Sequence, residues 1–180
     1  MDSLKTIPNK VKAIVSASAI GWYGADPVIP NPKPFEENCT ADETFLGNTC
    51  KLWEESIEPV TQSGKRLVKL RIGIVLSNDG GALSEFKKPL QFGVAAILGN
   101  GKQIISWIHI DDLVRMFITA IENTTMTGVY NAVAPVPVSN KELTIQFAKS
   151  RKQFFIPFHV PSFILKLMLG EMSIEILKSA

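Results

Sequence analysis

The sequence predicts an α/β protein, with a parallel sheet covered by helices and a small, mainly helical lobe toward the carboxyl terminus. Two apolar runs, at residues 11–17 and 67–76, have the continuous texture of strands that are buried on both faces. Between them, apolar side chains recur at steps of three and four, which is typical of a helix with one buried face. Strand, helix and strand in this order build parallel sheets through right-handed crossovers.

The first strand is expected to cover residues 11–17, and its run of small residues ends at Ala17. The helix that follows should bury a stripe composed of Leu46, Cys50, Trp53, Ile57 and Val60. Residues 67–76 predict the second strand. Residues 82–97 then predict a helix that is interrupted near Pro89, because proline removes a donor from the helix interior.

The later elements are marked by capping residues. Residues 103–110 read as extended, and Asp111 can cap a helix through Ile121 by accepting hydrogen bonds from its first amides. Residues 129–134 predict another strand, and Ser139 and Glu142 have the spacing of a capping box for a helix through Lys149. We therefore expect residues 1–150 to form the α/β domain and residues 151–180 a helical cap.

Composition and charge exclude several classes of partner. Nineteen basic and seventeen acidic residues give a formal charge of +2, without the basic clusters of a nucleic-acid-binding protein. No apolar segment is long enough to span a bilayer, so we expect no membrane partner and a cytoplasmic location. Cys39 and Cys50 have no CxxC or Cys/His cluster around them, and they predict reduced thiols and no metal site.

Ser16 and Ser18 come at the end of the first strand, where open α/β sheets bind ligands. The alternative is that these small residues only let a helix approach the sheet. Neither serine has the glycines of a G-x-S-x-G nucleophile. Arg71 lies inside the second apolar strand, so it must reach a carboxylate, a carbonyl oxygen or a ligand phosphate.

Five ordered motifs together resemble a known family. They are SASAIGWYG, RIGIVL, GGAL, GNGKQIISWIHIDDL and YNAVAPVPVSNKEL. Together they are similar to the atypical short-chain dehydrogenase/reductase group called sugar-nucleotide epimerase-like, some members of which carry a cell-division-inhibitor label. The resemblance runs from residue 11 to about residue 177. It implies a Rossmann-type fold that binds NADP(H), with later segments forming a substrate lobe.

The resemblance also implies roles for individual residues. Ser18 and His109 are the polar candidates for assisting chemistry. Contacts to the nicotinamide side of the cofactor are expected from Ser16, Arg71, Ile72, Gly73 and Ile74. Contacts to the substrate are expected from Lys102, Gln103 and Trp107. The alternative is that residues 99–111 have only a structural role and form a turn, a strand and a helix cap. His109 and Asp111 share one side of an extended run, but two ligands without a third do not make a metal site.

The sequence departs from the family pattern in two ways. It has no G-x-G-x-x-G fingerprint for the cofactor pyrophosphate, so NADP(H) binding is expected to be weak or absent. The short-chain dehydrogenase pair of tyrosine and lysine, four residues apart, is also missing, since Pro27 follows Tyr23 and Ala134 follows Tyr130 at that spacing. The chain therefore resembles the later part of a longer protein, which would leave a sheet edge open for homo-oligomer formation.

Three interpretations remain open at this point. In the first, the chain is the substrate-side portion of an NADP(H)-dependent oxidoreductase or epimerase-like protein acting on an unidentified small molecule, and it is inactive when isolated. In the second, it is a nucleotide-sensing or protein-interaction module that kept the fold and lost the Tyr/Lys pair. In the third, it is a truncated product without activity of its own.

Overall fold

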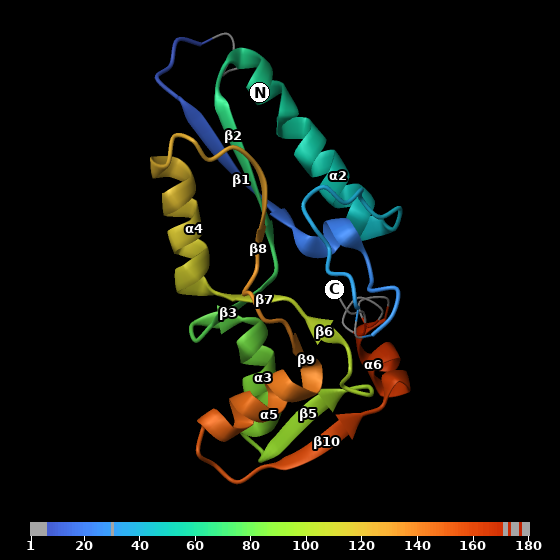
Figure 1. Ribbon diagram of the computed structural model, residues 1–180. Coiled ribbons are helices and arrows are strands. Elements are labelled where there is room, and N and C mark those ends of the chain that lie inside the picture. Colours follow the sequence, from blue (N-terminus) through green and yellow to red (C-terminus); the bar gives the residue numbers. More distant parts are fainter. Residues whose placement is uncertain (1–6, 30, 171–172, 174–176, 178–180) are drawn as a thin grey trace. The chain divides into compact units, whose positions relative to one another are not determined.

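The structure is a computed structural model that describes residues 7–29, 31–170, 173 and 177 (Figure 1). The chain forms two compact units, and each is discontinuous in sequence. The first unit consists of residues 7–24, 34–73 and 110–133. The second consists of the described positions among residues 25–33, 74–109 and 134–177.

The first unit is built on a three-stranded parallel sheet. Its strands β1 (Ala13–Ala19), β2 (Arg66–Ile72) and β8 (Gly128–Ala132) lie in the order β1-β2-β8, and both strand pairs are parallel. The register places every residue of β1 opposite a residue of β2. The expected parallel sheet and the strand, helix, strand order are therefore confirmed, with β1 beginning at Ala13 rather than at residue 11.

Helices cover both faces of this sheet. α2 (Phe45–Ile57) packs against one face and α4 (Ile110–Glu122) against the other (Figure 1). Val68 and Leu70 of β2 are fully buried, as expected for a strand that is covered on both sides. Two short 3₁₀ helices, Ile20–Tyr23 and Glu58–Ser63, follow β1 and α2.

The buried face of α2 differs from the predicted stripe at one position. Cys50, Ile57 and Val60 are buried as predicted. Trp53 is 46% exposed, so the expectation that it lies in the core is wrong. The neighbouring Glu54 is buried in its place, because a charged partner on β2 faces it. An apolar scale cannot anticipate this exchange, since it scores a carboxylate as a surface group.

Over its described residues, the second unit contains three small sheets. The first joins β3 (Ile74–Ser77) to β4 (Gly80–Gly81), antiparallel, and to β7 (Trp107–His109), parallel. The second pairs β5 (Val94–Leu98) with β10 (Ile156–Val160) in parallel. The third pairs β6 (Ile104–Ile105) with β9 (Val138–Ser139), antiparallel.

The second unit also contains the helices α3 (Ala82–Leu90), α5 (Asn140–Ser150) and α6 (Ser162–Leu169). The predicted capping box at the start of α5 is confirmed. The Ser139 hydroxyl accepts from the Glu142 amide at 3.1 Å, and the Glu142 carboxylate accepts from the Ser139 amide at 2.9 Å. α3 and α5 pack against β5, around the buried Leu90, Ala95 and Ala148.

Two expectations about single elements are wrong. The helix predicted for residues 82–97 ends at Leu90, because Gly93 takes a positive φ of 73° and the apolar run after it pairs as β5. Residues 156–160 form strand β10, although the pattern after residue 150 predicts helix. Of the cap expected through residue 180, the positions beyond Gly170 lie outside the described residues, except for 173 and 177.

Candidate functional site

A buried polar cluster lies near the carboxyl end of the β1-β2-β8 sheet. We call it the Arg71 cluster, and it consists of Ser18, Tyr23, Glu54, Arg71 and Asn131. Ser18 of β1 and Asn131 of β8 are the register partners of Arg71 on β2, so the three residues share one face of the sheet. Glu54 comes from α2 on that face, and Tyr23 comes from the 3₁₀ helix after β1.

Arg71 and Glu54 form a bidentate ion pair in the interior. The guanidinium Nε donates to Glu54 Oε1 at 2.8 Å, and Nη2 donates to Oε2 at 3.2 Å. Only 2% of Arg71 and 3% of Glu54 is exposed. Arg71 was predicted to reach a carboxylate, a carbonyl oxygen or a phosphate. This prediction is confirmed, and the carboxylate is that of Glu54 in the same chain.

The remaining members close the cluster with hydrogen bonds. The Ser18 hydroxyl donates to Glu54 Oε1 at 2.8 Å. Arg71 Nη1 donates to the Tyr23 hydroxyl at 2.9 Å and to the Glu37 carbonyl oxygen at 3.1 Å. The Tyr23 hydroxyl in turn donates to Asn131 Oδ1 at 2.7 Å. The network thus ties all three strands to α2 and to the segment around residue 37.

Aromatic rings shield this charge from solvent. The Arg71 guanidinium carbon lies 3.7 Å from the centroid of the Trp22 ring, within the range of a cation–π contact. Tyr23 stacks on Phe35, with 5.2 Å between ring centroids and 10° between planes. The Trp22 indole donates to the Cys39 carbonyl oxygen at 2.9 Å, which fixes the ring in place.

Burial and charge act in opposite directions on the titratable groups. Burial disfavours the charged form of Glu54, but hydrogen bonds from Arg71 and Ser18 and the positive charges of Arg71 and Lys69 hold its pKa below the ordinary value. Burial raises the pKa of the Tyr23 phenol despite its hydrogen bond from Arg71. At neutral pH the carboxyl is therefore ionised, and the Tyr23 phenol keeps the proton that it donates to Asn131.

Both predicted serines already have partners inside the protein. The Ser18 side chain is 4% exposed, and its proton is donated to Glu54. Ser16 is partly buried, and its hydroxyl donates to the Ala17 carbonyl oxygen at 3.1 Å. For Ser18 to polarise a substrate carbonyl, its hydroxyl would have to rotate away from Glu54. The cofactor role of Ser16 and the catalytic role of Ser18 stay predictions.

The backbone that was expected to pass the nicotinamide is divided between the two units. Ile72 ends β2 and Gly73 follows it, with the Gly73 amide donating to the Ala132 carbonyl oxygen of β8 at 3.2 Å. Ile74 begins β3 in the second unit and is 40% exposed. The single strand predicted for residues 67–76 is therefore two strands that separate at Gly73.

The predicted substrate residues all lie in the second unit, within or beside β6 and β7. Lys102 is exposed, whereas Gln103 is 3% exposed and donates from its side chain to the Leu98 carbonyl oxygen at 3.1 Å. The Trp107 indole donates to the Val136 carbonyl oxygen at 3.1 Å. His109 ends β7 with an exposed side chain. Gln103 thus makes a contact that holds its own loop, and Lys102 and His109 face solvent.

The residues of the first unit fit one end of a dinucleotide. In Rossmann-type sheets the cofactor lies beyond the carboxyl ends of the strands. Ala19 and Ile72, which end β1 and β2, are partly buried apolar residues that suit a flat nicotinamide ring, whereas Ala132 at the end of β8 is fully buried. The pyrophosphate fits poorly, because Arg71 is paired internally and the sequence has no G-x-G-x-x-G fingerprint.

Sequence reasoning missed Glu54, Tyr23 and Asn131 as members of the cluster. A signal for Glu54 was present: it stands four residues after Cys50 and three before Ile57, on the buried face of one helix. Combined with the need of Arg71 for a carboxylate, this spacing indicates Glu54 as the partner. No comparable signal marks Asn131, because its position depends on the register between β2 and β8.

Two kinds of feature are absent from the described residues. They contain no group of three or more His, Cys, Asp and Glu side chains that could hold a metal ion. None of the helices in the described part of the chain is both long and apolar enough to cross a membrane.

Comparisons with known proteins point to one family. The epimerase family protein YfhF of Bacillus subtilis is 38% identical over 172 residues, covering 94% of this chain and 54% of YfhF. The human epimerase family protein SDR39U1, crystallised with NADPH, superposes with a TM-score of 0.86 at 28% identity, over 99% of this chain and 59% of that one. A nucleoside-diphosphate sugar epimerase of Corynebacterium glutamicum gives a TM-score of 0.67 at 31% identity, over 92% and 36% of the two chains.

The matched relatives are all longer than this chain. The chain spans about half the length of the curated relatives it matches, 52% and 54% in two examples. No protein-family model matches the chain.

Proposed function

Since the chain belongs to the epimerase-like group of the short-chain dehydrogenase/reductase family, we propose that it provides the substrate-side part of an NADP(H)-dependent oxidoreductase or epimerase-like protein. The observation that carries this proposal is the likeness to human SDR39U1, crystallised with NADPH, over 99% of this chain. The apolar strand ends at Ala19 and Ile72, both partly exposed, support it, because they suit the nicotinamide end of such a cofactor. The substrate is a small molecule whose class the site does not specify.

The proposal predicts that the 180-residue chain binds the nicotinamide half of the cofactor and not the adenosine half. With a Kd near ~1 mM, ~1 mM NADPH stabilises the fold by only about 0.4 kcal/mol, a shift of about 1–2 °C in Tm. Saturation-transfer NMR should show stronger signals from the nicotinamide protons than from the adenine protons. Reduced nicotinamide mononucleotide should bind as tightly as NADPH, and 2′,5′-ADP should not bind. A low-micromolar Kd for NADPH, or signals dominated by adenine, would contradict the proposal.

One observation favours a second function, a nucleotide-sensing or interaction module without catalysis. Neither tyrosine has a lysine four residues later, and burial raises the pKa of Tyr23. The usual base of short-chain dehydrogenases is thus not provided by these residues. A protein that binds the nicotinamide fragment as above, but exchanges no solvent deuterium into any sugar-nucleotide substrate supplied with it, would favour this second function.

His109 is expected to serve a ligand rather than the fold. Because its side chain is exposed at the end of β7, His109→Ala should change the free energy of unfolding by less than about 0.5 kcal/mol. The adjacent Ile108 is 3% exposed, and Ile108→Ala is the matched control, with an expected loss of about 2–5 kcal/mol. Thermal melts of both variants measure this. If His109→Ala lowers Tm as much as Ile108→Ala does, His109 is a structural residue.

A further inference from the structure

Four apolar side chains are exposed on the β5/β10 sheet of the second unit and on the two loops that lead into it. Phe92 is 85% exposed, Phe154 82%, Ile156 58% and Phe158 54%. We call these four residues the Phe92 patch. Side chains of this size are seldom left in water in such a group, and exposed apolar groups commonly mark a binding surface.

The register of the sheet explains why these side chains meet. Ile156 is the partner of Val94, and a Cβ atom on Gly93 would lie 3.7 Å from the Phe154 carbonyl oxygen, so the two loops run close together just before the strands begin. The Ile156 amide donates to the Gly93 carbonyl oxygen at 2.8 Å, which joins the two loops directly. Both loops lead from the end of a helix into a parallel strand, α3 into β5 and α5 into β10, and so they lie at the same end of the unit.

The patch faces away from the helices of its unit. Ala95 of β5 is fully buried against α3 and α5. Because side chains alternate along a strand, its neighbours Val94 and Ala96 point to the other face of the sheet. Ile156 and Phe158 pair with those neighbours, Val94 and Ala96. Their side chains therefore lie on the face that α3 and α5 do not cover.

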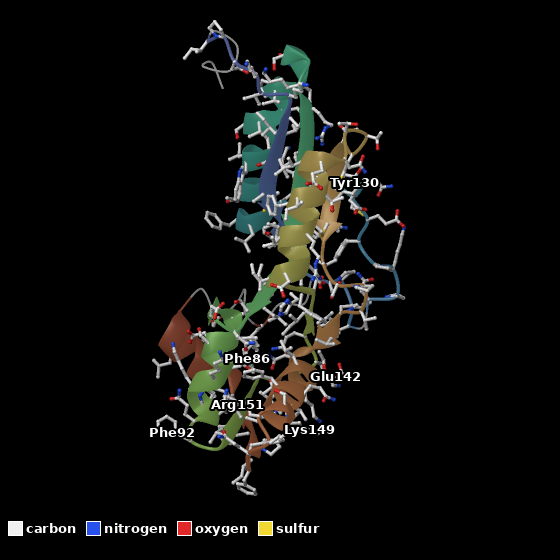
Figure 2. All side chains as sticks on the ribbon, turned by 90° about the vertical axis from the view of Figure 1, so that its left-hand side faces the viewer. Phe86, Phe92, Tyr130, Glu142, Lys149 and Arg151 are labelled. Atoms are coloured by element: carbon white, nitrogen blue, oxygen red, sulfur yellow. The ribbon has the colours of Figure 1, made fainter. Side chains whose placement is uncertain are left out.

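Basic residues border the patch. Residues 147–156 contain Lys149, Arg151 and Lys152 and no acidic residue. None of these three makes an ion pair with another described residue, whereas Lys88 in the last turn of α3 is paired with Glu85 at 2.7 Å. Figure 2 shows Phe92, Lys149 and Arg151 around one end of the second unit. Glu142 lies in the first turn of α5, about 10 Å from Lys149 along the helix axis.

Stabilisation of the helix end accounts for only part of this arrangement. A lysine in the last turn of α5 is favourable for the helix dipole. The dipole does not explain why large apolar side chains are exposed beside the positive charges. The combination fits a partner that is both apolar and anionic.

Two other occupants of the patch are disfavoured by the structure. A second copy of the chain in a symmetric dimer would bring Arg151 and Lys152 close to their own copies, and Pro157 removes a donor from the exposed edge of β10. Near the carboxyl terminus, the described residue Leu177 lies at the opposite end of β5. There Leu177 lies within 3.0 Å of where a side chain on Gly99 would begin, about 20 Å from Phe92 along the strand.

We propose that the Phe92 patch and its basic border bind the surface of an anionic phospholipid membrane. The four apolar side chains insert at the level of the headgroups, and Arg151 and Lys152, in the loop that carries Phe154, contact lipid phosphates and carboxylates. No membrane partner is expected from the sequence, because no segment is long enough to span a bilayer, but surface binding needs no such segment. This inference does not depend on the proposed cofactor.

Flotation of the full 180-residue chain with lipid vesicles tests the proposal. Vesicles of phosphatidylcholine with about 30% phosphatidylserine should carry the protein upward, and phosphatidylcholine alone should not. Raising NaCl from about 0.05 M to about 0.5 M should release it, because salt screens the basic border. Flotation is chosen because aggregated protein sinks and is not counted as bound.

Variants separate the two parts of the surface. Arg151→Glu with Lys152→Glu should reduce binding by roughly 25-fold or more, since each basic residue near an anionic surface contributes about fivefold. Phe92→Ser with Phe154→Ser should reduce it by about tenfold or more, because the inserted apolar area is lost. The matched control is Phe45→Ser on α2, which removes a phenylalanine that is 81% exposed in the first unit and should leave binding unchanged.

Three outcomes would overturn the proposal. The first is that the wild-type chain does not bind the phosphatidylserine vesicles at low salt. The second is that Phe45→Ser weakens binding as much as the change of Phe92 and Phe154 does. The third is that the chain, in a parallel anisotropy titration, binds a fluorescent uridine oligonucleotide in preference to the vesicles, which would assign the patch to nucleic acid. Circular dichroism of each variant confirms that it is folded.

Discussion

Replacing Glu54 with alanine is expected to lower the free energy of unfolding by about 3–5 kcal/mol, because it leaves the Arg71 charge buried without its carboxylate. The change also removes the acceptor of the Ser18 hydroxyl. Urea denaturation followed by circular dichroism measures the loss as a lower midpoint. The matched control is Glu58→Ala, one helical turn later. Glu58 is also paired with a lysine, Lys69 at 2.9 Å, but its side chain is 54% exposed.

The control should cost less than about 1 kcal/mol, because water screens the exposed Glu58 carboxylate and Lys69 keeps its second partner, Glu54, at 3.4 Å. Where Glu54→Ala does not fold, the double change Glu54→Leu with Arg71→Met supplies a second measurement. It replaces the whole ion pair by apolar groups, which is often neutral or stabilising, and it should recover most of the loss. Equal effects of Glu54→Ala and Glu58→Ala would contradict the central place of the Arg71–Glu54 pair.

The same pair predicts how stability depends on pH. The pKa of Glu54 is lower in the folded protein than the ordinary value of 4.5, because Arg71, Ser18 and Lys69 outweigh the effect of burial. The unfolded chain therefore binds the proton more readily, and the contribution of Glu54 is complete above about pH 4.5. This stabilisation decreases as the pH falls below about 4.5, and it is gone once the pH is below the lower pKa that Glu54 has in the folded protein. Glu54→Ala should flatten this acid limb, and the Glu58→Ala control should retain it.

Replacing Gly47 with alanine is expected to destabilise the fold by about 1–3 kcal/mol, although alanine is the better helix former by about 1 kcal/mol. A Cβ atom at this position of α2 would lie 2.2 Å from the Asp42 carbonyl oxygen and 2.9 Å from the Asp42 Cβ. The Asp42 segment must therefore move. Its amide donates to the Trp22 carbonyl oxygen at 2.7 Å, so the movement reaches the ring that covers Arg71.

Gly80→Ala is the control for this substitution. A Cβ at Gly80 would meet no heavy atom within 4 Å, and its φ is not in the left-handed region. The expected change is within about 0.5 kcal/mol. Urea denaturation measures both variants, and tryptophan fluorescence should report a changed environment for Gly47→Ala alone. A Gly47→Ala variant that is more stable than the wild type would show that the loop at Asp42 moves at little cost.

The positions of the site residues show how far the sequence alone could lead. It predicted that Arg71 needs a partner, since a guanidinium within a strand that is covered on both faces cannot reach water. The chain has several glutamates in the preceding segment, among them Glu37, Glu43, Glu54 and Glu58. The helical phase of α2 narrows the choice to Glu54. The rotation of α2 about its own axis then decides between Trp53 and Glu54, and that depends on what β2 presents to it.

The sequence by itself determined the elements whose causes are local: the strand at β1, the helix between β1 and β2, and the capping box of α5. The spacing of apolar residues and the capping residues involve positions only three or four apart in sequence. They therefore favour the same helix or strand wherever the segment lies in the fold. Only the tertiary structure decided that β10 pairs with β5, and that Ser18, Arg71 and Asn131 meet on three adjacent strands. The register between strands is set by side chains 50 or more positions apart, which must pack and pair together before any one of these contacts forms.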